Sequence, residues 1–188
     1  MAELFYIIGA SGVGKDSLLR YARAHMPPDV AVIFAHRYIT RAADAGGENH
    51  IALTTHEFHC RSRKGCFAMQ WHSHQTWYGI GIEINQWLAQ GLSVVMNGSR
   101  AYLQDAASNY PQLAPVLISA NSNSLRKRLA ARGRESSEEI EERLSLAAEL
   151  DSLTKHPRLI RIDNNGPLAE AGENLVQLIQ GQRSQACA

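Results

Sequence analysis

The sequence predicts an α/β protein with a parallel sheet of about five strands and helices on both faces. Short apolar runs rich in β-branched residues alternate with helical patterns along the 188 residues, as expected when helices connect parallel strands. The first apolar run leads into a glycine-rich loop that is followed by a helical pattern, which is typical of a phosphate-binding loop. A hydrophobic content of 45% allows one domain, residues 1–188, with a sizeable core.

The expected strands share an apolar character on successive residues, which indicates burial on both faces of the sheet. They are Leu4–Ile8, Val30–Ala35, Leu92–Met96, Val116–Ser119 and Leu159–Ile162. The expected helices lie between and after them, at Ser17–Ala24, Ile82–Gln90, Arg100–Ser108, Ser124–Ala131, Glu138–Leu153 and Leu168–Ile179.

The first loop has the spacing G-x-x-x-x-G-K, formed by Gly9, Gly14 and Lys15. Glycines let backbone N–H groups turn toward one concavity, and the following helix directs the positive end of its dipole there. Lys15 adds a charge that reaches the outer phosphates of a nucleotide. The loop usually ends in Ser or Thr, but here Asp16 precedes Ser17. The predicted donor-binding residues are Gly9, Ala10, Ser11, Gly12, Val13, Gly14, Lys15, Asp16 and Ser17, with Asp16 and Ser17 predicted to hold magnesium.

Two further segments point to phosphate chemistry. Residues 36–81 interrupt the alternation after the second strand, at the carboxyl edge where open α/β sheets bind ligands, and we interpret them as an acceptor-binding subdomain. Residues 126–143 are rich in arginine, and Ser136 or Ser137 can cap a helix entered by Glu138 and Glu139. A solvated helix pair with i,i+4 charge pairs explains that composition, but beside a phosphate loop a mobile arginine lid explains it better.

Composition excludes several classes of function. A net charge of +1 gives no general attraction for nucleic acid or membranes. Three cysteines without a C-x-x-C pair favour a reducing, cytoplasmic location. Histidines and cysteines crowd into residues 56–74, but their spacing fits no common zinc pattern, so ordinary histidines are favoured over a metal site. We expect a small-molecule substrate as partner, and a homodimer is left open.

The chain resembles the guanylate-kinase-like branch of the nucleoside monophosphate kinases over nearly its full length. The stretches that carry the resemblance are GASGVGKDSLL, HRYITR with GGE after it, FAMQWHSHQTWYGI, RLAARGRESSEEIEERLSLAAEL and DNNGPLAEAG. The resemblance implies a P-loop kinase three-layer fold with ATP on the first stretch. It places Arg41 and Tyr78 on the acceptor phosphate and makes Lys15, Arg128, Arg132 and Arg143 catalytic. Asn164 or Asn165 would lie next to the adenine, and the alignment favours Asn165.

The departures from the guanylate kinase pattern concern the acceptor. Met69 and Ile80 stand where that family has the Glu and the small hydroxyl that read guanine, and an unpaired base edge would lose about 1–3 kcal/mol per polar group. Arg37 replaces a guanine-contacting Ser, and His50 aligns with a phosphate-binding Tyr. Asp44 falls on the second acceptor arginine, and Asn97, Ser99 and Arg100 replace an acidic strand end. We expect a sugar with phosphates at more than one position, bound by Arg37, Tyr38, Arg41, His50, Tyr78 and Arg100.

One subgroup matches the altered pattern, the ribose 1,5-bisphosphate phosphokinases of phosphonate degradation. The chain shares their GKDS loop, the HRYITR and GGENH stretches and the NGSR strand end. The resemblance implies magnesium-dependent transfer of the γ-phosphoryl group of ATP to the 1-phosphate of ribose 1,5-bisphosphate, giving 5-phosphoribosyl 1-diphosphate (PRPP). The acceptor oxygen is already an anion, so the reaction needs positioning and charge stabilisation rather than a general base. The alternatives are a guanylate or related nucleoside monophosphate kinase, and a non-catalytic protein-binding module of the same fold.

Overall fold

The computed structural model describes residues 2–45, 48–133 and 136–181, with the backbone alone for Arg132. The chain forms two compact units, each assembled from two separate stretches. The first unit comprises Met1–Tyr6 and Ala31–Leu113, and the second comprises Ile7–Val30 and Ala114–Ala188. Strand β1 (Leu4–Ile8) therefore contributes residues to both units.

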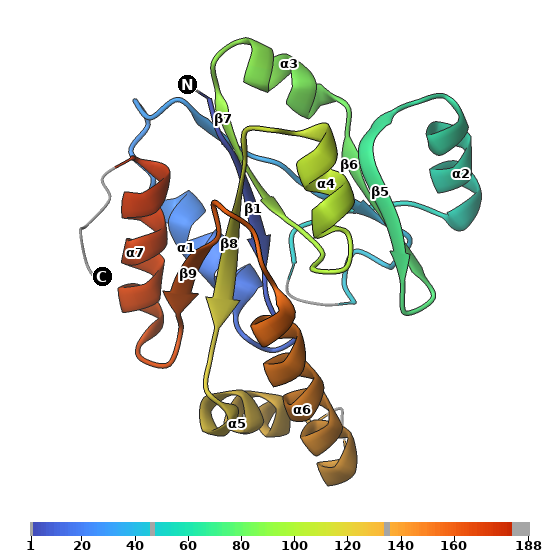
Figure 1. The fold of residues 1–188 in the computed structure, drawn as a ribbon. Helices are drawn as coiled ribbons and strands as arrows, with labels where there is room; N and C mark the ends of the chain where they lie inside the picture. The colour runs from blue at the N-terminus through green and yellow to red at the C-terminus, as the bar shows by residue number, and fades with distance from the viewer. Residues whose placement is uncertain (1, 46–47, 134–135, 182–188) are drawn as a thin grey trace. The chain divides into compact units, whose positions relative to one another are not determined.

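The predicted five-stranded sheet is confirmed, with the strand order β2-β7-β1-β8-β9 (Figure 1). The other strands are β2 (Val32–Phe34), β7 (Ser93–Asn97), β8 (Leu113–Ser119) and β9 (Ile160–Asp163). β2 pairs in parallel with β7, and β8 pairs in parallel with β9. Every residue of β1 is buried, and so are the first six residues of β8. Burial on successive residues means that both faces of these strands are covered, as their apolar sequences predicted.

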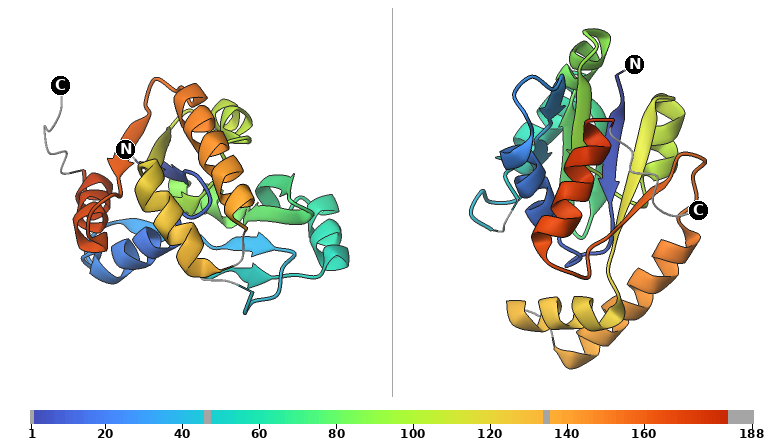
Figure 2. Two further views of the ribbon diagram at one scale, coloured as in Figure 1. Left: turned by 90° about the horizontal axis from the view of Figure 1, so that it is seen from below. Right: turned by 90° about the vertical axis from the view of Figure 1, so that its left-hand side faces the viewer.

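The helices of the second unit are α1 (Lys15–His25), α5 (Ser122–Arg132), α6 (Ser137–Leu153) and α7 (Leu168–Ile179). α1 and α7 lie side by side in both figures (Figure 1, Figure 2). Gly172 of α7 allows this approach, because a Cβ there would lie 2.3 Å from the ring of Tyr21. α5 packs against α6, and Ser136 starts α6 with a complete capping box in which Glu139 takes part.

The first unit also contains a second sheet, in the order β4-β3-β6-β5. Its strands are β3 (Arg37–Ile39), β4 (Ile51–Ala52), β5 (Phe67–Ser73) and β6 (Thr76–Gly81). β5 and β6 form an antiparallel hairpin whose two-residue turn, His74 and Gln75, has positive φ at both positions, as a type I′ turn requires. This sheet and α2 (Thr55–Arg63) make up the segment that the sequence marked as the acceptor-binding subdomain.

Two short helices complete the first unit, α3 (Glu83–Ala89) and α4 (Leu103–Asn109). The expected helix at Arg100–Ser108 starts later, because Arg100 to Tyr102 form a turn in which Leu103 N donates to Arg100 O. In the described part of the chain, none of the helices is long and apolar enough to cross a membrane.

Candidate active site

The phosphate-binding loop has backbone positions that only glycine accepts. Gly9 has φ 149°, and a Cβ there would lie 2.4 Å from Ile118 O at the end of β8. Gly14 has φ 102°, and a Cβ there would lie 2.5 Å from Asn164 Nδ2. Because Gly14 is also the N-cap of α1, the first N–H groups of that helix receive no side-chain cap. Their partial positive charge is thus directed at the loop, as an anion site requires.

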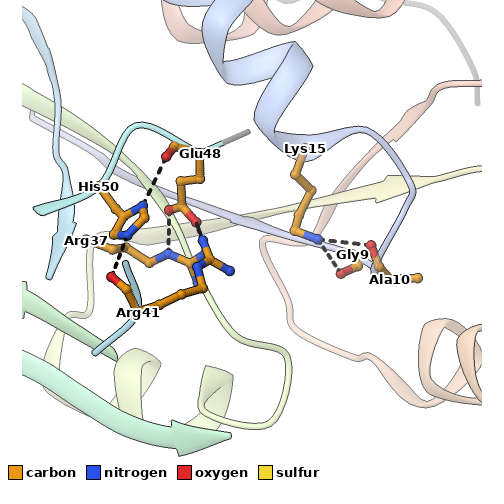
Figure 3. Close-up of polar contacts among 7 residues, drawn as sticks. All are labelled: Gly9, Ala10, Lys15, Arg37, Arg41, Glu48 and His50. Carbon is orange, nitrogen blue, oxygen red and sulfur yellow. Dashed lines mark hydrogen bonds and ion pairs between the residues drawn. The ribbon is translucent and has the colours of Figure 1, made fainter. Parts of the chain in front are cut away.

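Lys15 is the first residue of α1, and its side chain folds over the loop. Lys15 Nζ donates to Gly9 O at 2.8 Å and to Ala10 O at 2.9 Å, as Figure 3 shows. Two backbone carbonyls of the loop therefore hold the ammonium group of Lys15 in place. A phosphate bound in the loop would accept from the same group.

Arg128 and Asn164 also contact the loop, at Val13. Both side chains donate to Val13 O, from Arg128 NH1 at 2.9 Å and from Asn164 Nδ2 at 2.8 Å. Arg128 NH2 also donates to Asn164 O at 2.7 Å. The predicted lid arginine Arg128 is thus tied to the donor loop and to the end of β9. A guanidinium with both terminal nitrogens engaged in this way positions the loop.

The two asparagines after β9 have different surroundings. Asn164 is 2% exposed, and its Oδ1 is buried with no hydrogen-bond partner. Asn165 is exposed, and its Oδ1 accepts from Asn121 N at 2.7 Å while its Nδ2 donates to Asp163 at 2.7 Å. The structure thus places Asn164 against the loop, whereas the sequence alignment favoured Asn165 as the residue next to the adenine.

The predicted lid region, residues 126–143, covers most of α5 and the first part of α6, and residues 134–135 within it lie outside the described residues. Arg126 forms a bidentate pair with Glu141, both bonds at 2.8 Å, which joins the two helices. The carboxylate of Glu139 accepts from Ser136 N. Arg143 is exposed on α6. The side chain of Arg132 lies outside the described residues.

In the first unit, Arg37, Arg41, Glu48 and His50 form one cluster (Figure 3). Glu48 receives two bonds from Arg37, one from Nε at 2.6 Å and one from NH2, and it lies 3.9 Å from Arg41 NH2. His50 is buried, with Nδ1 3.0 Å from Glu48 O and Nε2 3.2 Å from Arg41 O. Arg41 Nε is buried without a hydrogen-bond partner. The cluster thus has two positively charged guanidinium groups and one negatively charged carboxylate, that of Glu48. Arg41 Nε is the donor that could bind an anion.

Tyr78 lies beside this cluster. The guanidinium carbon of Arg37 lies 4.8 Å from the centroid of the Tyr78 ring, a cation–π contact. The structure therefore brings together four of the predicted acceptor residues, Arg37, Arg41, His50 and Tyr78. It adds Glu48 of the GGENH stretch, which was not among the predicted acceptor residues.

Tyr38 is not part of this group, because successive side chains of a strand point to opposite faces. Its neighbour Arg37 points to the Tyr78 face, while Tyr38 packs on Phe67 and contacts Glu83 and Arg61. Burial raises the pKa of Tyr38, and the charge of Glu83 adds to this. The expectation that Tyr38 binds the acceptor together with Arg37 is therefore not supported by its position. Arg100 lies half-buried in the turn before α4.

Met69 and Ile80 lie directly opposite each other on β5 and β6, at 1% and 0% exposure. These are the two positions where the guanine-reading groups were expected to be missing. An apolar pair buried to this degree offers a base edge no acceptor.

The histidines and cysteines of residues 56–74 do not gather around one point. His59 and His72 pack against Trp77, while His56 lies 3.6 Å from Cys60 Sγ on α2. Among the residues that the structure describes, no three such side chains are arranged to hold a metal ion.

Comparison with known proteins finds many relatives over nearly the whole chain. The ribose 1,5-bisphosphate phosphokinase PhnN of Psychromonas ingrahamii is 53% identical over 180 residues, covering 96% of this chain and 91% of that protein. The protein of the same description from Desulfomicrobium baculatum is 54% identical over 179 residues, covering 95% of each chain. A scan against models of protein families gave no match.

Among solved structures, guanylate kinase from Anaplasma phagocytophilum superposes with a TM-score of 0.67. The alignment covers 98% of this chain and 88% of that one at 16% identity. This likeness confirms the predicted α/β P-loop kinase fold.

Proposed function

Because this chain belongs to the family of ribose 1,5-bisphosphate phosphokinases, we propose that it transfers the γ-phosphoryl group of ATP to ribose 1,5-bisphosphate. The new P–O bond forms at a terminal oxygen of the 1-phosphate, the bond from the γ-phosphorus to the bridging oxygen breaks, and ADP leaves. The product is 5-phosphoribosyl 1-diphosphate. No proton has to move, because the attacking oxygen is already ionised.

The loop of the second unit supports ATP as the donor. Gly9 and Gly14 let the loop pack closely against Ile118 and Asn164, where a Cβ would clash. The N-terminus of α1 and Lys15 supply positive charge at this loop. Arg128 and Asn164 orient the loop through Val13 O. Asp16 and Ser17 follow Lys15 with oxygen donors of the kind that magnesium prefers. Bound magnesium would neutralise charge on the β- and γ-phosphates.

The Arg37–Arg41–Glu48–His50 cluster carries the assignment of the acceptor. It brings together the guanidinium groups of Arg37 and Arg41, of which Arg41 Nε is buried without a partner, and the Arg37 guanidinium lies against the Tyr78 ring. Such groups bind phosphate through charge-assisted bonds. The adjoining pair Met69 and Ile80 offers nothing to a nucleobase. An anion-binding face without a base reader fits a sugar bisphosphate better than a nucleotide.

The test is ADP release from ATP with ribose 1,5-bisphosphate and GMP as parallel acceptors. We expect efficient turnover with the sugar bisphosphate and poor turnover with GMP, since each unpaired polar group of the base costs about 1–3 kcal/mol. If GMP is used as efficiently as the sugar bisphosphate, the chain is a guanylate kinase. If neither acceptor supports ADP release, the non-catalytic protein-binding module becomes the better account.

A further inference from the structure

Tyr78 lies in a continuous stack of aromatic rings. Trp71 is directly opposite Tyr78 on the neighbouring strand β5, with ring centroids 5.6 Å apart and an interplanar angle of 6°. Tyr102, the N-cap of α4, stacks on Trp71 at 5.6 Å and 25°. Trp71 is 8% exposed. Trp71 has apolar neighbours along the chain, as a core residue would, and its stack with Tyr102 joins segments that are far apart in the sequence.

The strand order shows that Tyr78 is enclosed from two sides. β6 lies between β3 and β5 in the sheet. Arg37 therefore approaches the Tyr78 ring from β3, while Trp71 approaches it from β5 on the other side. In the series Arg37, Tyr78, Trp71, Tyr102, the ring surfaces are covered by neighbouring side chains of the protein. The buried pair Met69 and Ile80 lies two residues along the same face.

We propose that Trp71 determines acceptor choice by occupying the space beside Tyr78 with a side chain of the protein, so that the site accepts sugar phosphates that carry no base. The same stack holds the Tyr78 ring, and with it the hydroxyl that the proposed function assigns to the acceptor phosphate. Trp71 is thus a positioning residue that acts through Tyr78. This inference rests on the proposed function, since it assumes that Arg41 and Tyr78 bind the acceptor.

The test compares two tryptophans of the same sheet. Trp71→Leu removes the stack on the Tyr78 face, and Trp71→Phe keeps an aromatic ring there. Trp77→Leu is the matched control, because Trp77 lies on β6 but packs on the opposite face against Phe58 and His59. Steady-state kinetics would be measured for each variant with ribose 1,5-bisphosphate, ribose 5-phosphate and GMP as acceptors, and with ATP varied separately.

We expect Trp71→Leu to raise the KM for ribose 1,5-bisphosphate roughly three- to tenfold, the range of an aromatic pair. Its preference for the sugar bisphosphate over GMP should fall by at least the same factor, with the KM for ATP unchanged. Trp71→Phe should restore most of the preference, and Trp77→Leu should keep it.

Two results would overturn the inference while leaving the proposed function intact. One is a Trp71→Leu enzyme with unchanged acceptor preference, and the other is an equal loss of preference in Trp77→Leu. By contrast, an unmutated protein that does not use ribose 1,5-bisphosphate would overturn the proposed function itself.

Discussion

At the scale of single residues, Lys15 has a role that its contacts define closely. Its ammonium group donates to two backbone carbonyls of the loop that it follows. The Lys15 side chain is only half-buried, so its removal should cost little stability. We expect Lys15→Ala to lower kcat/KM roughly ten- to a hundredfold, the value of one charge-assisted contact of about 1.5–3 kcal/mol. The melting temperature should change by less than about 4 °C.

Lys64→Ala is the matched control, because Lys64 is the exposed C-cap of α2. It should leave both kinetics and melting temperature unchanged. Activity of Lys15→Ala within about threefold of the unmutated protein would show that Lys15 does not bind the transferred phosphate.

Glu48 holds two arginines that the proposed function requires. Its carboxylate is bonded to Arg37 and lies 3.9 Å from Arg41, so Glu48→Gln removes the charge that fixes both guanidinium groups. We expect the KM for the acceptor to rise roughly tenfold, with the KM for ATP unchanged.

Glu57→Gln provides the comparison, since Glu57 forms an exposed i,i+4 pair with Arg61 on α2, and such pairs contribute about 0.3–0.5 kcal/mol. A lower acceptor KM in Glu48→Gln would mean that Glu48 competes with the substrate for the arginines instead of positioning them.

These residues also show how far sequence predicts a site. The loop glycines and Lys15 lie where the motif predicted, because their roles depend on local backbone geometry. The catalytic role predicted for Arg128 and the acceptor binding predicted for Arg37 stay predictions. In the structure Arg128 also donates to Val13 O, and Arg37 is also paired with Glu48, and neither partner was predicted. Which partner a long charged side chain reaches depends on contacts between distant segments, and spacing along the chain does not encode those.

At the scale of elements, the loop before α1 allows a direct test of why Gly14 is required. Gly14→Ala combines a left-handed φ of 102° with a contact 2.5 Å from Asn164 Nδ2, and Asn164 is held by its bond to Val13 O. Gly91→Ala is the control, because Gly91 has φ 83° but nothing within 4 Å of its added Cβ. We expect Gly91→Ala to cost about 1–2 kcal/mol, the penalty of left-handed backbone alone.

Gly14→Ala should cost more than Gly91→Ala in urea unfolding, and it alone should weaken ATP binding in calorimetry. Equal losses of stability and unchanged ATP binding would show that the contact with Asn164 relaxes without cost.

The start of α6 offers a second element with a matched pair. Ser136 Oγ accepts from Glu139 N at 3.2 Å, and the Glu139 carboxylate accepts from Ser136 N at 2.7 Å. Ser136→Ala should destabilise the protein by about 1 kcal/mol, or roughly 2–4 °C in melting temperature. Ser137→Ala, one residue later, should have no measurable effect. Similar shifts for both variants would contradict the capping role of Ser136.

All five predicted strands and all six predicted helices are present, because apolar runs and periodic patterns are typical of regular elements. The burial expected on both faces holds for β1 but not for β2, which is half-buried, or for β9, where Arg161 and Asp163 are exposed. The second sheet and α2 were not predicted as elements. β3 has three residues and β4 has two, which is too short for a pattern. The hairpin of β5 and β6 is stabilised by pairs such as Trp71 with Tyr78, and these become neighbours only after the strands have paired.

At the scale of the whole molecule, the tyrosines with shifted titration all lie in the first unit. Burial raises the pKa of Tyr6, Tyr38, Tyr102 and Tyr110 above the usual value near 10. A raised pKa means that the folded state holds the proton more tightly than the unfolded state. The resulting stability is complete below pH 10 and is lost as the pH rises toward the folded-state pKa values. We expect alkali to unfold the first unit before the second.

The three tryptophans Trp71, Trp77 and Trp87 also lie in the first unit. The longer helices α1, α5, α6 and α7 lie in the second unit, whereas the shorter α2, α3 and α4 lie in the first. Tryptophan fluorescence should therefore change at a lower pH than most of the helical circular dichroism. Coincident transitions by both signals would contradict separate responses of the two units.

Tyr6→Phe should be less stable at pH 7, because Ser99 N loses its bond to the hydroxyl, but its stability should depend less on pH above 10.

The division of the chain into interleaved stretches affects the order in which the protein acquires its parts during synthesis. All residues of the first unit have been made once the ribosome has passed Leu113. The phosphate-binding loop is made before its three partners, Ile118, Arg128 and Asn164, which follow it in the chain. A nascent chain therefore carries the glycine-rich loop without all of these partners until Asn164, just after β9, has been made. Only then are all the contacts present that hold the loop in its folded conformation.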